Sequence, residues 1–254
     1  MARAHRLHVE CGIFHVTHRC HDRAFLLKFA RDRDAYRSKM REALRQFEIW
    51  LLDYCLTSNH VHLLIDAEER LEVSGFMQKV AGEFARGYNQ RKGRTNAFWG
   101  DNFHATLVDS GEYLWRCLRY IELNMVRCGV VSHPREWEWC GHREIMGTRK
   151  RYRLLDLDRL CWRLATEDLD GMDGMRSHLA NTLEERIARD ELKREACWTE
   201  SLAVGNPSFL ERIKPLVLSR RETQIVEAMA DLWVLKEPEI PYTRRSDLEI
   251  SANQ

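Results

Sequence analysis

A histidine pair separated by one residue is the first feature of this sequence that could do chemistry. If His60 and His62 lie on a β-strand, their side chains project from the same face, roughly 7 Å apart at the backbone. Two imidazoles placed in this way can share one metal ion. The pattern is weak on its own, because two histidines on a half-polar strand without a metal are more common.

A phenol and an amide lie one helical turn apart at Tyr120 and Asn124. The spacing of the segment predicts a helix whose apolar stripe faces the core, made of Leu114, Leu118, Ile121 and Met125. Tyr120 and Asn124 fall on the neighbouring stripe with Tyr113, so we expect them to meet at the edge of a sheet. The plain alternative is a boundary tyrosine that packs its ring and leaves its hydroxyl in water.

The elements that must position these residues follow from hydrophobic periodicity. We predict strands over 13–19, 49–56, 60–65 and 103–108 and helices over 32–47 and 71–88. A last helix is expected from about 109 to 126, with Asp109 at its N-terminus and Glu112 as its capping partner. Such a βαββαβ order folds as a ferredoxin-like antiparallel sheet with helices on one face, and the last helix is additional. The predicted fold class is α+β.

Three regions are expected along the chain. Residues 1–147 would form the domain that carries the candidate residues, 148–240 a mostly α-helical extension and 241–254 a flexible tail. Segments 208–214 and 220–229 could be a helix pair that binds DNA, although core or partner-binding helices are the commoner explanation.

The composition of the chain excludes a disordered or fibrous protein. The chain has 254 residues, 44% of them hydrophobic, and can bury one good core and a smaller second one. Neither a signal peptide nor a membrane span is visible in the sequence, so we expect a cytoplasmic protein.

Charge is unevenly distributed along the chain. Residues 1–150 have 24 Lys and Arg against 19 Asp and Glu, or +5, and the remainder has 16 against 20, or −4. A basic front half suits a phosphate-rich partner and is also ordinary for a solvated surface.

Cysteine usage favours reduced thiols, because the eight cysteines include no Cys-x-x-Cys pair. Cys11, His15, His18, Cys20 and His21 crowd one segment. Their spacing matches no zinc template, and a strand would alternate them between its faces. A zinc site in this segment is therefore a minor alternative.

Several short segments occur in a characteristic order. They are FHVT at 14–17, NHVHLL at 59–64, YN at 88–89, FWG at 98–100, LRYIELN at 118–124 and VRCGVV at 126–131. Together they resemble the REP-associated tyrosine transposases, which are single-tyrosine HUH transposases of the IS200-like superfamily. The resemblance covers roughly residues 8–147, and its specific parts are the His-x-His and Tyr-Ile-x-Leu-Asn segments.

The resemblance implies an HUH nuclease domain of ferredoxin-like fold. Its tyrosine, here Tyr120, attacks a phosphodiester, becomes linked to the 5′ phosphate and leaves a free 3′ hydroxyl. Its metal ligands map onto His60, His62 and Asn124. Imidazole and amide-oxygen ligands admit Mg²⁺ or Mn²⁺ as the cofactor.

This assignment makes physical sense. A phenol with a pKa of about 10 is a poor nucleophile at neutral pH, and a phosphodiester repels anions. A divalent ion on a non-bridging phosphate oxygen offsets the charge of the transition state and orients the scissile bond. A phosphotyrosine also stores the energy of the broken bond, so that strands can be rejoined without ATP.

Some positions depart from the family pattern. Family members often read Asn-Pro-Val-Arg-Ala-Gly where this chain has Met125 and Cys128, so the last helix could run slightly longer. A family arginine near the fourth strand is Asn102 here, which puts one phosphate contact in doubt.

Candidate DNA contacts combine cations with aromatic rings, as single-strand binding sites do. A solvated loop beside core aromatics explains the same residues equally well. The candidates are Arg86, Arg91, Lys92, Arg94, Trp99, Arg119 and Arg127.

The function that we predict is a metal-dependent endonuclease and strand transferase for single-stranded DNA with hairpin or repeat structure. It would be a transposase that forms a 5′-phosphotyrosine intermediate, acting as a monomer or homodimer away from membranes and associated with the nucleoid when bound to DNA. One alternative is a non-catalytic regulator that recognises repeat hairpins. The other is a domesticated nuclease that processes chromosomal repeats.

Overall fold

A four-stranded antiparallel sheet forms the centre of the front half of the chain, in the order β3-β4-β2-β5. The computed structural model describes residues 6–7, 11–165, 169–218 and 222–238. The core elements in chain order are β2 (Gly12–Arg19), α1 (Ala30–Ala43), β3 (Ile49–Leu56), β4 (His60–Ala67), α2 (Arg70–Lys92) and β5 (His104–Val108). This is the predicted βαββαβ order with the strand arrangement of a ferredoxin-like sheet, so the predicted fold class is confirmed for this part.

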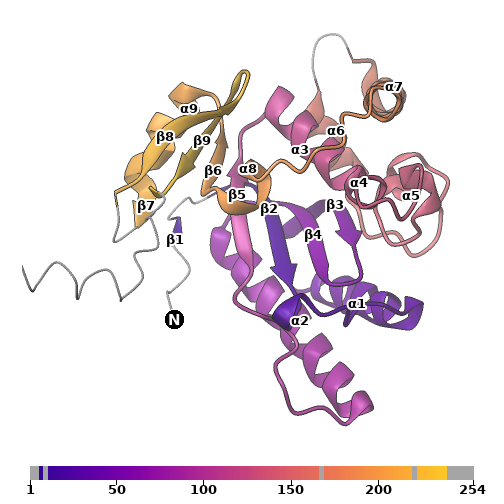
Figure 1. The fold of residues 1–254 in the computed structure, drawn as a ribbon. Helices are drawn as coiled ribbons and strands as arrows, with labels where there is room; N and C mark the ends of the chain where they lie inside the picture. The colour runs from indigo at the N-terminus through magenta and orange to yellow at the C-terminus, as the bar shows by residue number, and fades with distance from the viewer. Residues whose placement is uncertain (1–5, 8–10, 166–168, 219–221, 239–254) are drawn as a thin grey trace, which may run out of the picture.

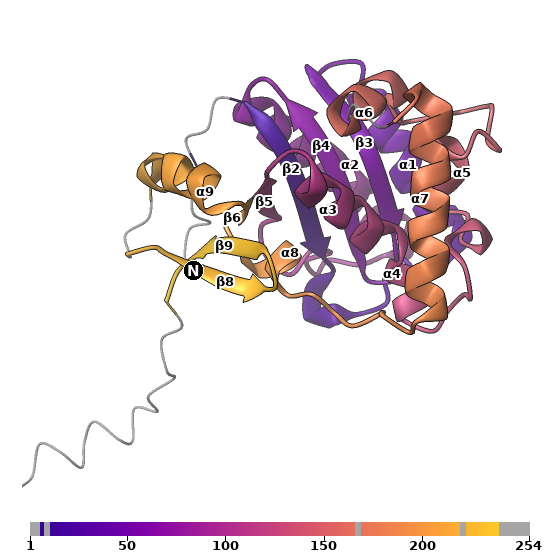
Figure 2. The same ribbon diagram turned by 90° about the horizontal axis from the view of Figure 1, so that it is seen from above.

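Helices cover both faces of this sheet (Figures 1 and 2). α1 and α2 lie on one face, and α3 (Glu112–Glu122) lies on the other. Side chains alternate along each strand, so buried Phe14 and Val16 face α1 and α2. The rings of Tyr36 and Phe84, one from each of these helices, meet edge to face with centroids 5.2 Å apart. One face of the sheet is thus sealed by apolar packing, and polar chemistry is left to the α3 face.

The last helix of the core differs in detail from the prediction. It begins after Gly111 rather than at Asp109, whose carboxylate accepts a hydrogen bond from the amide of Asn206 instead of capping the helix. Leu123 has ψ 2° and divides the helix into α3 and α4 (Asn124–Arg127). Gly129, with φ 67°, then ends it in a left-handed conformation that suits glycine.

The rest of the chain adds helices and extends the sheet. Short 3₁₀ helices are η1 (His21–Arg23), η2 (Pro134–Glu136) and η3 (Lys214–Leu216). The remaining helices are α5 (His142–Ile145), α6 (Leu157–Leu164), α7 (Gly171–Ala188), α8 (Cys197–Glu200) and α9 (Pro207–Ile213). The remaining strands are β1 (Arg6–Leu7), β6 (Ala203–Gly205), β7 (Val217–Leu218), β8 (Gln224–Met229) and β9 (Leu232–Lys236).

The predicted mostly α-helical extension is wrong for its last part. β6 pairs in parallel with β5, and β9 and β8 follow, so the described residues form a seven-stranded sheet in the order β3-β4-β2-β5-β6-β9-β8. The helix expected over 220–229 is the strand β8 from residue 224 onward, and 219–221 lie outside the described residues. The predicted tail over 241–254 also lies outside them, and the domain boundary after 147 stays a prediction. In the described part of the chain, no helix is long and apolar enough to cross a bilayer.

An ion-pair cluster fastens α6 to the sheet. Asp66 of β4 is fully buried and accepts hydrogen bonds from Arg159 Nε at 2.5 Å and from Arg163 Nε at 2.7 Å. We expect Asp66→Ala to lower the free energy of unfolding by about 3 kcal/mol, because it leaves the partly buried Arg159 and Arg163 without their anionic partner. Urea unfolding followed by circular dichroism measures this change.

The matched control is an exposed pair on α7. Asp173 is 95% exposed and lies 3.3 Å from Arg176. Asp173→Ala should change the free energy of unfolding by less than about 0.5 kcal/mol, because solvent screens such a pair. Equal effects of the two substitutions would show that Asp66 does not anchor α6.

Candidate active site

Polar side chains from three neighbouring strands share the sheet face that α3 covers. The strand register pairs Arg19 with His60 and Thr17 with His62 across β2 and β4. Across β2 and β5 it pairs Thr17 with His104. Directly paired residues in antiparallel strands project from the same face. The spacing of the two histidines and this register therefore put both imidazoles among other polar groups.

α3 and α4 carry Tyr120 and Asn124 onto this polar row. The predicted apolar stripe of the helix is buried, which fixes the helix orientation. The Tyr120 ring centroid lies 6.0 Å from the centroids of both His62 and His15. Asn124 Nδ2 lies 2.9 Å from His62 Nε2. The meeting place lies over the interior strands β2 and β4, so our expectation of a site at the sheet edge is wrong.

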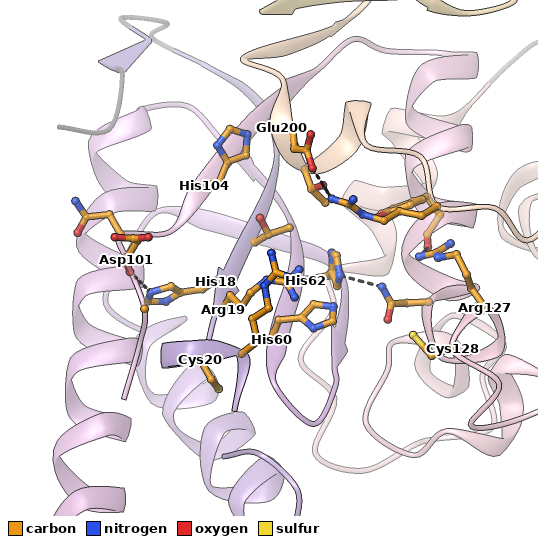
Figure 3. A pocket seen from close by; sticks show the side chains of 18 of the residues that line it. His18, Arg19, Cys20, His60, His62, Asp101, His104, Arg127, Cys128 and Glu200 are labelled. Carbon is orange, nitrogen blue, oxygen red and sulfur yellow. Dashed lines mark hydrogen bonds and ion pairs between the residues drawn. The ribbon is translucent and has the colours of Figure 1, made fainter. Parts of the chain in front are cut away.

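A cavity of about 730 Å³ lies where the strands and this helix meet, and Figure 3 shows its lining side chains. His60, His62, Tyr120 and Asn124 all line it. The residues that the sequence singled out from two distant segments thus converge on one space. Tyr113, which the sequence places on the same stripe as Tyr120, instead donates a hydrogen bond to the Asp231 carbonyl 3.2 Å away.

Residues of its own hairpin hold the His60 ring in one tautomer. Its Nδ1 lies 2.7 Å from Asn59 Oδ1, and Asn59 Nδ2 donates to the carbonyl of Arg23 at 3.0 Å. Because Asn59 Oδ1 can only accept, His60 Nδ1 carries the proton and Nε2 keeps a lone pair. Burial, aided by the positive charge of Arg19, lowers the pKa of His60 to about 3. The ring is neutral at physiological pH, as a metal ligand must be.

His62 and Asn124 form the deeper part of the site. Burial is the main reason that the pKa of His62 lies well below its usual value, and neighbouring His60 lowers it further. Asn124 is also buried, and its Oδ1 has no hydrogen-bond partner among the described residues. A buried amide oxygen without a partner costs free energy, which a bound cation would recover.

These donors could hold a divalent ion. Two neutral imidazoles and one amide oxygen would leave the remaining positions of an ion such as Mn²⁺ or Mg²⁺ to water. In the part of the chain that the structure describes, no group of three His, Cys, Asp or Glu side chains is arranged to hold a metal ion. The zinc alternative for segment 11–21 consequently has no such ligand set within that part.

Tyr120 sits in a basic environment. Burial raises the pKa of its hydroxyl, whereas the guanidinium groups of Arg127 and Arg194 act in the opposite direction. The Arg127 guanidinium lies 4.2 Å from the centroid of the Tyr120 ring. Arg19 and Arg127 line the same cavity, so an anionic group placed beside the phenol would be attracted there, whereas Arg194 is paired with Glu200 at 2.5 Å.

The candidate DNA contacts fall into two groups. Arg127 lines the cavity, whereas Arg119 is buried and paired with Glu112 at 2.6 Å. Arg91 forms an ion pair with Asp32 of α1. Arg119 and Arg91 are thus engaged within the protein, which does not favour their predicted role.

The remaining candidates lie around the end of α2. The Trp99 ring stacks on His18 with centroids 4.1 Å apart, and its Nε1 donates to the Ala81 carbonyl. Arg86 and Lys92 are exposed. Arg94 is partly buried, and its guanidinium lies 5.8 Å from the centroid of the Tyr88 ring. Trp99 therefore lies behind His18, which lines the cavity, whereas Arg86, Lys92 and Arg94 are not among the lining residues. The DNA role of all four stays a prediction.

Sequence reasoning missed several cavity residues. Arg19 could have been found, because it lies two residues after Thr17 on the same strand face. Arg194 and Glu200 come from the extension, and nothing in their spacing relates them to the histidines. Asn102, which replaces the family arginine, also lines the cavity.

Comparisons with known proteins show similarity in sequence and in fold. Residues 8–124 match the family model described as "Transposase IS200 like". The solved structure titled "Structure of the REP associates tyrosine transposase bound to a REP hairpin" is 16% identical, with a TM-score of 0.50, and the match covers 67% of this chain and 94% of that chain. This likeness shows a shared fold.

A putative transposase from Deinococcus radiodurans is 17% identical over 43% of this chain and 87% of its own, with a TM-score of 0.34, which is too low to support the fold. No curated protein matches the chain. Residues 8–124 of the chain are thus similar to the IS200-like transposases.

Proposed function

We propose that this chain is an IS200-like transposase, that is, a metal-dependent endonuclease and strand transferase for single-stranded DNA, with Tyr120 as the nucleophile. One observation carries the proposal. The Tyr120 side chain, two neutral imidazoles and a buried amide group with an unpartnered oxygen border the same cavity, although they come from segments about 60 residues apart.

The reaction begins with the phenol oxygen of Tyr120 in line with a scissile phosphodiester. A bond forms between this oxygen and phosphorus while the bond from phosphorus to the 3′ oxygen breaks. The phenol proton passes to water, and the leaving 3′ oxygen takes a proton from water. The product is a 5′-phosphotyrosine and a free 3′ hydroxyl. Attack of a 3′ hydroxyl on the phosphotyrosine reverses these steps and rejoins strands.

Protein groups prepare this step. His60, His62 and Asn124 would hold a divalent ion, which when bound neutralises charge on a non-bridging phosphate oxygen. Arg127 attracts the phosphate and favours ionisation of the phenol as it reacts. The burial of Tyr120, which is 4% exposed, keeps the phenol neutral until substrate arrives.

The substrate class that we propose is DNA with a hairpin. The solved structure of similar fold is that of a REP-associated tyrosine transposase bound to a REP hairpin. The basic front half of this chain suits such a polyanion. An alternative in which the chain only binds hairpins would leave the buried amide oxygen and the neutral imidazoles without a role.

The test uses the full-length chain and end-labelled hairpin oligonucleotides from the DNA that flanks its gene. With Mg²⁺ or Mn²⁺, denaturing electrophoresis should show a covalent protein–DNA band and a fragment that a polymerase can extend from its 3′ end. Chelation of the metal should remove both products. A fully paired duplex of the same sequence is the matched control and should give neither.

Hairpin binding without either product, across both metals, would overturn the proposal in favour of a non-catalytic binder. Cleavage that persists after chelation would remove the metal from the mechanism.

A further inference from the structure

A chain of hydrogen bonds links the C-terminal extension to the candidate metal site. The carbonyl oxygen of Trp198, in α8, lies 2.8 Å from His15 Nδ1. His15 Nε2 lies 2.9 Å from His62 Nδ1. His62 Nε2 in turn lies 2.9 Å from Asn124 Nδ2. Four residues from β2, β4, α4 and α8 thus form one connected path.

The carbonyl end of this path determines where every proton lies. A carbonyl only accepts, so His15 Nδ1 must carry a proton. His15 is fully buried, and its two ring nitrogens face only the Trp198 carbonyl and His62, so a second proton on its ring would be an uncompensated buried charge. His15 Nε2 therefore accepts, and His62 Nδ1 donates to it. His62 Nε2 faces Asn124 Nδ2, which can only donate, so this nitrogen keeps its lone pair.

The Trp198 carbonyl is itself held in place. Thr106, which pairs with His15 across β2 and β5, has its Oγ1 3.2 Å from this oxygen and 2.8 Å from the Ser201 carbonyl. The Trp198 side chain is fully buried, and its Nε1 donates to Glu195 at 2.6 Å. The burial of the Trp198 side chain and its bond to Glu195 thus hold the residue that supplies the first acceptor of the path.

We propose that His15 is a positioning residue and that, with the Trp198 carbonyl of the extension, it holds His62 in the tautomer whose Nε2 is unprotonated. The proposal rests on the proposed function only in taking His62 as a metal ligand. His60 obtains the same tautomer from Asn59 in its own hairpin, whereas His62 depends on residues 15 and 198. The extension is therefore part of the active site and not an appended module.

The first test reads the tautomer directly in the metal-free, full-length protein. Nitrogen-15 NMR of the labelled histidine rings should show His62 and His15 protonated at Nδ1 and unprotonated at Nε2. A His62 ring protonated at Nε2 would overturn the proposal. This measurement needs no substitution in the path and does not depend on cleavage.

The second test compares two substitutions at the same position. Glutamine at 15 can donate to the Trp198 carbonyl and accept from His62 Nδ1, whereas phenylalanine can do neither. We expect His15→Phe to weaken Mn²⁺ binding about 10- to 100-fold in calorimetric titration, and His15→Gln to remain within about threefold of the unsubstituted chain. The NMR signals of His62 should move to the other tautomer only in His15→Phe.

Equal Mn²⁺ affinities of the two variants, or an unchanged His62 tautomer in His15→Phe, would overturn the proposal. Failure of the proposed function looks different, because the unsubstituted chain would then bind no Mn²⁺ or form no DNA adduct. The nitrogen-15 spectrum would still decide which tautomer the path imposes.

Discussion

Tyr120→Phe is expected to abolish the covalent protein–DNA adduct and to lower strand cleavage at least about 10³-fold, because it removes the only attacking oxygen. The ring keeps its place beside Arg127, His15 and His62, since the hydroxyl alone is lost. Hairpin binding should therefore change by less than about threefold. Denaturing electrophoresis of a labelled oligonucleotide measures adduct and cleavage, and fluorescence anisotropy measures binding.

Tyr113→Phe is the matched control for this loss. Tyr113 lies on the same helix, but its hydroxyl donates to the Asp231 carbonyl and takes no part in lining the cavity. The adduct should form at the unsubstituted rate in this variant. An adduct that survived in Tyr120→Phe and disappeared in Tyr113→Phe would move the nucleophile to residue 113.

His62→Ala should have the second large effect. It removes the central member of the donor set, which contacts both His15 and Asn124. Loss of one of three protein ligands is expected to weaken Mn²⁺ binding at least about 10²-fold and to lower cleavage by a similar or larger factor. Calorimetric titration with Mn²⁺ and the cleavage assay at saturating metal separate the two effects.

His178→Ala provides the control for removing an imidazole. His178 lies on α7, packs against Trp115 with ring centroids 4.6 Å apart, and does not line the cavity. This variant should bind Mn²⁺ as the unsubstituted chain does. If His62→Ala kept full Mn²⁺ affinity while its circular dichroism matched that of the unsubstituted chain, the metal ligands would have to be sought elsewhere.

The core of the fold was predictable because its signals are local. The strands β3 and β4 carry short apolar runs on either side of a turn, and the predicted 49–56 agrees with the observed β3. The α3 helix has a strong apolar stripe, so its buried face followed from the sequence. The convergence of His60, His62, Tyr120 and Asn124 could likewise be anticipated, given the family resemblance.

The extension was not predictable in the same way. β8 consists of Gln, Ile, Val, Glu, Ala and Met, four of which are good helix formers, so local preference does not indicate a strand. Pairing with β9 and the sheet decides its conformation. Trp198 and Arg194 reach the site only because α8 is placed beside β5, and no spacing in the sequence reports a contact between residues 15 and 198.

The pairing of β6 with β5 has a consequence for assembly. A ferredoxin-like sheet ends in two strands whose backbone groups are available to another chain. Here β6 pairs with one of these edge strands, β5. Backbone groups of Trp139, Gly141 and Asp156 form hydrogen bonds with the other edge strand, β3. Within the described residues, β8 is the remaining edge strand of this sheet, and most of its side chains are exposed. Strand addition between two copies would therefore have to use β8, far along the sheet from the nucleophile.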